Sequence, residues 1–222
     1  MSLRASAGTV VSVIGPNGSG KSTLLRCLAR QLPKMSGDIL IDGRSVDTYG
    51  QKEFARRVSY MRQERDAPVI SVERLALFGR FPYLGFPARF SEADREIARQ
   101  AMRRAGVLEL ADRNLPDISG GEAQRAYLAM ALAQEAEILL MDEPTTHLDI
   151  SHQRAILSLL RELAGEGKTI FVVAHDINNA ARVSDHILVM DRGRFAFSGA
   201  PADLADSSII MEVFGVPFDI RV

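Results

Sequence analysis

One segment near the start of the chain has the residue types and spacing of a phosphate-binding loop. Gly15–Ser22 (GPNGSGKS) matches the pattern G-x-x-x-x-G-K-[ST] in full. Its glycines allow backbone N–H groups to curl around an anion, and the helix that follows adds the positive end of its dipole. Lys21 is expected to reach the β- and γ-phosphates, and the Ser22 hydroxyl to bind Mg²⁺. The alternative, a glycine-rich turn that happens to contain a lysine, is disfavoured because a strand precedes the segment and a helix follows it.

Two carboxylates follow a short apolar run in the second half of the chain. Residues 138–141 (ILLM) predict a buried strand, and Asp142 and Glu143 come at its carboxyl end. Ligands of open parallel sheets bind at that edge, so both carboxylates are expected to face the phosphate loop. Asp142 is a candidate to hold Mg²⁺ through water, and Glu143 to orient or deprotonate the attacking water. An acidic strand end is by itself usually a solvated turn, and the phosphate loop favours the catalytic interpretation.

A histidine follows the next apolar run. His175 comes after residues 169–174 (TIFVVA) and is therefore expected at the same sheet edge, in reach of the γ-phosphate or the attacking water. The alternative is an exposed or hydrogen-bonded histidine without a role. His147, His152 and His186 show no spacing typical of metal ligands, and we interpret them as structural or surface residues.

A third segment, Ile118–Arg125 (ISGGEAQR), opens a predicted helix. Ser119 and Glu122 have the spacing of a capping box, so one interpretation is a well-capped helix. The same geometry also directs a helix N-terminus and two glycine amides outward, ready for a phosphate. Nothing in the sequence explains why two anion sites of one subunit would share a ligand, whereas two subunits facing each other would explain it.

The elements between these segments predict an α/β fold with a mostly parallel sheet. Strands are expected at 9–14, 39–41, 58–61, 138–141, 169–174 and 187–190, with a hairpin turn at 191–194 leading into 195–198. Helices are expected at 22–31, 91–106, 122–134, 151–164 and 177–183. Residues 67–137 differ in texture and are interpreted as an inserted helical subdomain carrying Ile118–Arg125. Residues 1–66 and 138–222 then form the P-loop core.

Composition excludes several classes of protein. The 222 residues are 46% hydrophobic and 25% charged, as in a globular protein. Twenty-seven basic against 28 acidic residues leave a net charge of −1, which gives no long-range field for nucleic acid. Cys27 is the single cysteine, which excludes an internal disulfide and suits a reducing cytosol. No apolar run reaches the roughly 18 residues needed to cross a bilayer.

The set of motifs and their order resemble the ATP-binding subunit of ABC transporters over nearly the whole chain. Besides the phosphate loop, the resemblance rests on Gln63 as the Q-loop, Ile118–Glu122 as the signature segment, Ile138–Glu143 as Walker B, Thr146–Asp149 as the D-loop and His175 as the switch histidine. It implies a P-loop ATPase fold in which Gln63 links the Mg²⁺ site to the helical insertion. It also implies that Ser119 and its glycines cap the γ-phosphate bound by a partner copy, and that Asp149 connects the two sites.

The resemblance completes the candidate site. The expected catalytic residues are Glu143, His175 and Gln63, and the expected metal ligands are Ser22, Gln63 and Asp142. The residues expected to bind ATP are Gly15, Pro16, Asn17, Gly18, Ser19, Gly20, Lys21, Ser22, Thr23, Ser119, Gly120, Gly121, Glu122 and Asp149.

Two further segments narrow the class. Gly79–Gly85 (GRFPYLG) and Asp142–Gln153 (DEPTTHLDISHQ) are similar to importers of iron-siderophores, haem and vitamin B12. The resemblance then implies an ATP-hydrolysing subunit with three kinds of partner: a second copy of itself, a polytopic membrane permease and, indirectly, a substrate-binding protein, with no nucleic acid. It implies a cytoplasmic place, peripheral on the inner face of the cell membrane. The alternative is a soluble ABC ATPase acting in assembly or repair. A GTPase or small-molecule kinase is disfavoured because the chain has no N-K-x-D motif and neither would use Ser119.

The chain departs from the family pattern in two places. The signature segment begins with Ile118 instead of leucine. Relatives carry an N-terminal antiparallel portion with an aromatic residue that stacks on adenine, and we expect it to be truncated here because none of the 14 residues before Gly15 is aromatic. Tyr49 or Phe54 would be the substitutes. In the resembling family the neighbourhood of Arg80–Tyr83 receives a coupling helix of the membrane subunit, so this segment is expected to be a docking surface.

Overall fold

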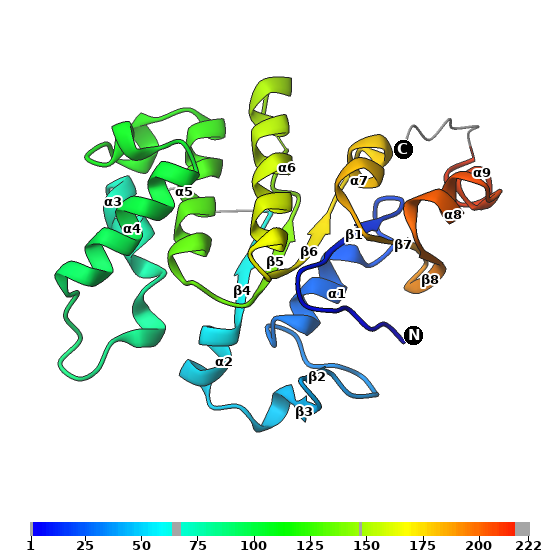
Figure 1. Ribbon diagram of the computed structural model, residues 1–222, viewed down its shortest axis with the longest axis horizontal. Helices are drawn as coiled ribbons and strands as arrows, with labels where there is room; N and C mark the ends of the chain where they lie inside the picture. Colours follow the sequence, from blue (N-terminus) through cyan, green and yellow to red (C-terminus); the bar gives the residue numbers. More distant parts are fainter. Residues whose placement is uncertain (1, 64–67, 147, 216–222) are drawn as a thin grey trace.

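The computed structural model describes residues 2–63, 68–146 and 148–215, and a central sheet organises them (Figure 1). Its strand order is β4-β5-β6-β1-β7-β8, with every neighbouring pair parallel except the antiparallel β7–β8 hairpin. The strands are β1 (Val10–Ile14), β4 (Val58–Met61), β5 (Ile138–Asp142), β6 (Thr169–Val173), β7 (His186–Asp191) and β8 (Arg194–Gly199). The predicted α/β fold with a mostly parallel sheet is confirmed.

The inner strands are buried because helices cover both faces of the sheet. Helix α1 (Lys21–Leu28) packs on the face to which Val11, Val13 and Leu140 point, whereas α6 (Ile150–Gly165) packs on the face of Leu139 and Met141. A third apolar cluster joins α7 (Ile177–Val183), α8 (Pro201–Ala205) and α9 (Ile209–Phe214) to β1 and β7. The carboxyl ends of β1, β5 and β6 therefore meet at one edge, where α1 begins.

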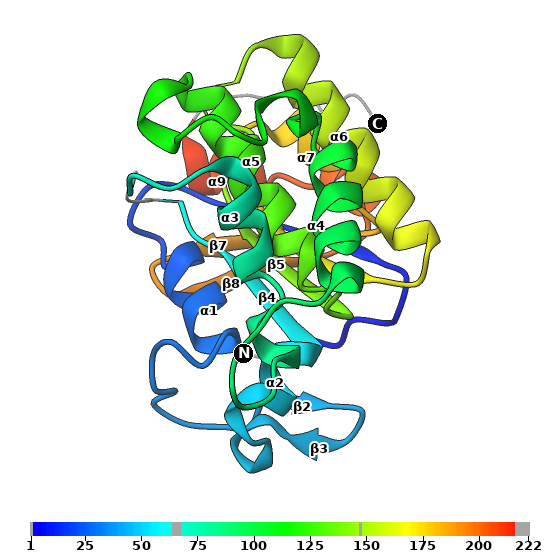
Figure 2. The ribbon, with the colours of Figure 1, turned by 90° about the vertical axis from the view of Figure 1, so that its left-hand side faces the viewer.

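Three helices gather beside α6, at the side of the sheet that faces the viewer in Figure 2. They are α3 (Val72–Phe78), α4 (Glu92–Arg104) and α5 (Gly120–Ala133). The predicted capping box at the start of α4 is present, since the Ser91 hydroxyl accepts from the Asp94 N–H at 3.2 Å and the Asp94 carboxylate accepts from the Ser91 N–H at 2.9 Å. Gly79 ends α3 against α5 so closely that a Cβ there would overlap the Met130 carbonyl oxygen.

A small antiparallel unit lies below the sheet in Figure 1. It contains the two-stranded ribbon of β2 (Leu40–Ile41) and β3 (Arg44–Ser45), a short 3₁₀ turn and helix α2 (Gln51–Arg57). Leu40 is 57% exposed on this ribbon. Its inner side chains, among them Ile41, Val46 and Phe54, join the same apolar cluster as α1.

The bounds differ from the predictions where the signals were weakest. The strand at Val58–Met61 and the helix at Ile177–Val183 have the predicted bounds. Helix α1 ends at Leu28 instead of residue 31, because Arg30 turns the chain with a φ of 56°. Helices α2, α3, α8 and α9 were not predicted. In the part of the chain that the structure describes, no helix has the length and apolar character to cross a membrane.

Candidate functional site

The phosphate loop forms the connection between β1 and α1. Gly15, Gly18 and Gly20 have φ values of 151°, 77° and 103°, which side chains disfavour, and a Cβ on Gly15 would overlap the Met190 carbonyl oxygen. Lys21 is 6% exposed and its Nζ donates to the carbonyl oxygens of Gly15 at 2.8 Å and Pro16 at 2.9 Å. Burial lowers the pKa of Lys21, while the Glu143 and Asp142 carboxylates act in the opposite direction. The lysine thus holds the loop closed around its own ammonium.

A cavity of about 400 Å³ opens over this loop. It brings the loop together with the Q-loop glutamine, the acidic end of β5 and the histidine after β6, four segments that lie far apart in the sequence. The lining residues are Asn17, Gly18, Gly20, Lys21, Ser22, Thr23, Gln63, Glu143 and His175. The cavity has room and positive charge for the phosphate chain of a nucleotide.

Asp142 ends β5 with its side chain directed toward α1. It is 2% exposed, and its two oxygens accept from different hydroxyl groups: Oδ1 from Ser22 Oγ at 3.1 Å and Oδ2 from the Tyr60 hydroxyl at 3.4 Å. Burial raises the pKa of Asp142, although both hydroxyl groups favour its charged form. Burial also raises the pKa of Tyr60 to about 12, so its hydroxyl group stays protonated as a donor at neutral pH.

Glu143 is the meeting point of the cavity. Its Oε2 accepts from Gln63 Nε2 at 2.6 Å and from Thr146 Oγ1 at 3.1 Å, and its Oε1 lies 2.6 Å from His175 Nε2. The residue is 6% exposed and has a φ of 54°, in the left-handed region that side chains rarely adopt. Gln124 of α5 donates to the Glu143 carbonyl oxygen at 3.1 Å. Three side chains and a strained backbone therefore fix one carboxylate beside Lys21.

The signature segment and Asp149 lie apart from this cavity. Ser119 is the N-cap of α5, and its predicted capping box is present: the Ser119 hydroxyl accepts from the Glu122 N–H at 3.3 Å, and Glu122 accepts from the Ser119 N–H at 2.8 Å. Asp149 is likewise the N-cap of α6 and accepts from the His152 N–H at 2.9 Å. Neither Asp149 nor Ser119, Gly120, Gly121 or Glu122 lines the cavity over the phosphate loop.

Comparisons with known proteins decide the family. A family model described as ABC transporter matches residues 1–146. The chain is 42% identical over 222 residues to the petrobactin import ATP-binding protein FpuC of Bacillus anthracis, covering 99% of this chain and 82% of FpuC. It is 41% identical over 211 residues to the ferric enterobactin transport ATP-binding protein FepC of Escherichia coli (strain K12), covering 94% of this chain and 78% of FepC. The chain belongs to the ABC transporter family.

A solved structure supports the same assignment. The dimeric, post-hydrolysis state of an ATP-binding cassette bound to ADP and Pi matches with a TM-score of 0.79 and 29% identity, covering 90% of this chain and 88% of that one. This chain is an ATP-binding subunit of the ABC transporter family and an ATPase.

One expected docking residue of this ABC subunit is a structural anchor instead. Arg80 is 5% exposed, and its Nε lies 3.0 Å from Asp94 Oδ1 while its Nη1 donates to the Ala133 carbonyl oxygen at 2.9 Å. The guanidinium thus ties the end of α3 to α4 and α5, and it is not part of a free surface. Phe81 fits the expectation better, since it is 48% exposed even though its ring stacks on Phe78 with centroids 4.9 Å apart.

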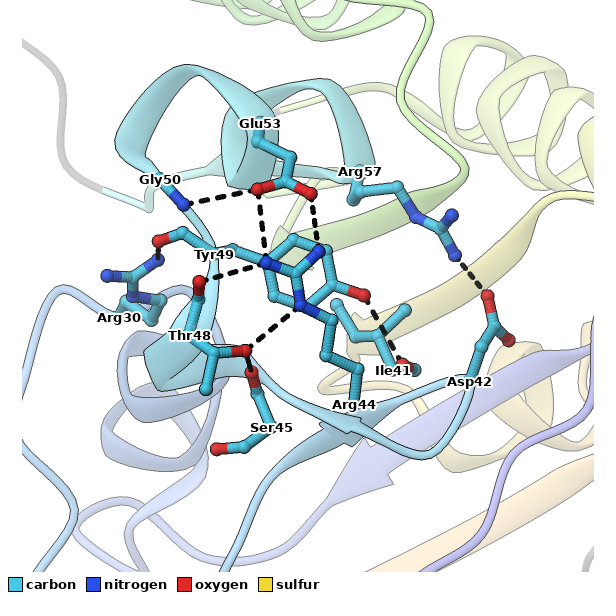
Figure 3. A network of polar contacts seen from close by, with 10 residues as sticks. All are labelled: Arg30, Ile41, Asp42, Arg44, Ser45, Thr48, Tyr49, Gly50, Glu53 and Arg57. Carbon is cyan, nitrogen blue, oxygen red and sulfur yellow. Dashed lines mark hydrogen bonds and ion pairs between the residues drawn. The ribbon is translucent and has the colours of Figure 1, made fainter.

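The two candidates for reading adenine are buried. Tyr49 and Phe54 are each 8% exposed and belong to the apolar cluster beneath α1. Figure 3 shows the ring of Tyr49 enclosed by the antiparallel unit, with the Arg44 guanidinium 3.9 Å from its centroid and its hydroxyl donating to the Ile41 carbonyl oxygen at 3.4 Å. Neither ring lines the nucleotide cavity, so the suggestion that one of them stacks on the base is wrong for this conformation.

Sequence reasoning missed three side chains of the site and left one histidine outside the described residues. Tyr60, Gln124 and Thr146 each hydrogen-bond to Asp142 or Glu143. The period-2 alternation of β4 could have placed Tyr60 on the same face as the carboxylate, once β4 and β5 were known to be neighbours. His152 and His186 have local partners, at Asp149 and Ser198, in agreement with a structural role. His147 lies outside the described residues.

Proposed function

We propose that this chain is the ATP-hydrolysing subunit of an importer of a metal chelate, such as an iron-siderophore or haem, or of cobalamin. The supporting observation is the similarity, over more than nine-tenths of the chain, to two ATP-binding proteins named for petrobactin import and ferric enterobactin transport. The segments Gly79–Gly85 and Asp142–Gln153 favour the same class. ATP binds over the phosphate loop, with Lys21 exchanging the carbonyl oxygens of Gly15 and Pro16 for phosphate oxygens.

Glu143 is the proposed general base. It is a carboxylate that faces the cavity, and a water attacking the γ-phosphate must replace one of its present donors, Gln63, Thr146 or His175. His175 is the exposed member of this group and can turn from Glu143 toward the γ-phosphate without disturbing the core. Gln63 holds the other carboxylate oxygen and carries the state of the site to the helices that follow it.

The residues expected to bind Mg²⁺ fit that ion. Ser22 Oγ and Asp142 Oδ1 lie 3.1 Å apart next to Lys21, and they are oxygen donors of the kind that Mg²⁺ prefers. Gln63 donates its amide nitrogen to Glu143, which leaves its amide oxygen as the third donor. When bound, Mg²⁺ supplies charge that neutralises the phosphate oxygens.

The second half of the nucleotide site is proposed to come from another copy of the chain. Ser119, Gly120 and Gly121 present the N-terminus of a 14-residue helix away from the chain's own phosphate loop, a geometry that suits a phosphate approaching from outside. Glu122 fixes Ser119, and Asp149 begins α6 near the same region of the sequence order. Two copies facing each other would then enclose two nucleotides.

The remaining parts of the proposal concern partners and place. Residues 67–137 form the helical subdomain, and residues 1–66 and 138–222 form the P-loop core. The helical subdomain, with the exposed ring of Phe81, meets a polytopic membrane permease, which in turn receives substrate from a substrate-binding protein. The chain is then cytoplasmic and peripheral on the inner face of the cell membrane.

Two experiments test the proposal. Glu143→Gln keeps the size of the side chain but removes the base, so steady-state ATP hydrolysis should fall by about 10²–10⁴ while ATP binding remains. In that variant ATP should also trap a dimer on size-exclusion chromatography. Near-normal turnover would remove Glu143 from the role of base. Affinity purification of the tagged chain from membranes should recover a polytopic permease, and purification with a soluble assembly or repair complex instead would refute the transport function.

A further inference from the structure

The Asp142 carboxylate is held by two hydroxyl groups, and the mechanism above uses only one of them. Ser22 Oγ donates to Oδ1 at 3.1 Å and comes from the phosphate loop, where it already belongs to the nucleotide site. The Tyr60 hydroxyl donates to Oδ2 at 3.4 Å and comes from β4, outside the motifs of the phosphate loop and Walker B. The question is therefore what this second donor does.

The position of Tyr60 follows from the register of the sheet. β4 and β5 are parallel, and Tyr60 lies opposite Leu140. Because side chains alternate along a strand, Leu140 and Asp142 point to the same face, which is the face that α1 covers. The Tyr60 ring packs against this cluster and its hydroxyl group extends one side-chain step further along β5, as far as Asp142. Phenylalanine at 60 would fill the same space but would not reach the carboxylate with a donor.

Two donors on different oxygens restrict the carboxylate in a way that one donor does not. The terminal torsion of an aspartate is broad, so a carboxylate held at one oxygen can still rotate about its Cβ–Cγ bond. Asp142 is 2% exposed, so water cannot readily supply the missing hydrogen bond. With both Ser22 and Tyr60 in place, the plane of the carboxylate is fixed beside the cavity.

We propose that Tyr60 is a positioning residue of the nucleotide site: its hydroxyl group fixes the Asp142 carboxylate in the orientation in which it takes part in holding Mg²⁺. This inference rests on the proposed function of Asp142. It assigns to β4 a role in metal-dependent nucleotide binding in addition to its role in the sheet. Tyr60 acts through Asp142 and contacts neither substrate nor the reacting atoms.

The test compares Tyr60→Phe with a matched control, Tyr49→Phe. The control also removes one phenol hydroxyl with a 3.4 Å hydrogen bond, here to the Ile41 carbonyl oxygen, outside the nucleotide cavity. Binding of ATP is measured by calorimetry with Mg²⁺ and with EDTA, and Mn²⁺ binding to the ATP complex by electron paramagnetic resonance. Urea unfolding checks that both variants are folded.

Tyr60→Phe should weaken Mn²⁺ binding and the Mg²⁺-dependent part of ATP affinity by about tenfold, the lower end for a hydrogen bond to a charged group. Its ATP affinity in EDTA, and both affinities of Tyr49→Phe, should stay within about twofold of the unmodified chain. Unchanged metal affinity in Tyr60→Phe overturns the inference, and so does an equal loss in EDTA, which would mean a general structural effect. Failure of the unmodified chain to bind ATP at all would refute the proposed function instead.

Discussion

Replacing Arg80 by alanine tests whether this residue is an anchor inside the helical group or part of a docking surface. The variant removes the donor to the Ala133 carbonyl oxygen and the ion pair with Asp94, whose side chains are 6% exposed for Arg80 and 12% for Asp94. It also removes the pair with Glu135, which is 51% exposed and can be hydrated, so this pair contributes little.

The expected loss follows from these contacts. A buried carbonyl left without a donor costs about 1–3 kcal/mol. Breaking a buried ion pair costs about 3–5 kcal/mol when the remaining charge is uncompensated. Asp94 keeps its hydrogen bonds from the Ser91 N–H and hydroxyl, so its share is smaller. Together we expect Arg80→Ala to lower the free energy of unfolding by about 3 kcal/mol.

Urea unfolding of the purified chain, followed by circular dichroism, measures this loss as a lower midpoint. Arg56→Ala is the matched control, because Arg56 is an exposed arginine that also lies over the Tyr83 ring and donates to the Pro82 carbonyl oxygen at 3.1 Å. It should cost about 1 kcal/mol or less, as surface contacts do. An Arg80→Ala midpoint equal to that of Arg56→Ala would refute the anchor and restore Arg80 to the docking surface.

Three further predictions concern the signature segment, the pH dependence of stability and the exposed aromatic ring. Ser119→Arg should leave ATP binding to the isolated chain intact and abolish steady-state hydrolysis, because its bulk enters only the site of a partner copy; undiminished hydrolysis would contradict the composite site. The pKa of Asp94 is lowered from 3.8, chiefly by the hydrogen bond from the Ser91 side chain, so its stabilising effect is complete above that pH and lost as the pH falls further. The difference in unfolding free energy between the unmodified chain and Asp94→Asn should therefore be constant above pH 3.8 and shrink below it, and a constant difference at all pH values would refute this origin. Phe81→Ala should keep the soluble ATPase rate and reduce transport by the assembled system, whereas equal losses of both would indicate a folding defect.

The sequence predicted the elements that carry strong local signals. The apolar strands, the glycines of the phosphate loop and the capping residues Ser91 and Ser119 each act within a few residues, so their pattern can be read along the chain. The same signals place Lys21, Asp142 and Glu143 at one sheet edge, because the carboxyl ends of parallel strands must meet there.

Contacts between distant segments could not be predicted in this way. Arg80 lies in an aromatic, glycine-containing segment that resembles a surface loop, and its burial depends on Asp94 and Ala133, which only the packing of α4 and α5 brings near. Tyr60 has no chemical signal within a four-residue strand until the register of β4 against β5 is known. Helix α2 was missed because its seven residues have no long apolar period and its stability comes from contacts with the ribbon and with the segment after α3.

The backbone of Glu143 has a consequence for protein engineering. A residue with a side chain in the left-handed region carries a strain of about 1–3 kcal/mol, which glycine would relieve and asparagine would reduce. A library of variants selected only for heat resistance should therefore enrich glycine or asparagine at position 143, and each such chain would lose the proposed base in the same step. Thermal selection and catalytic turnover thus act against each other at this position, and stabilising the enzyme requires a screen that measures hydrolysis in every round.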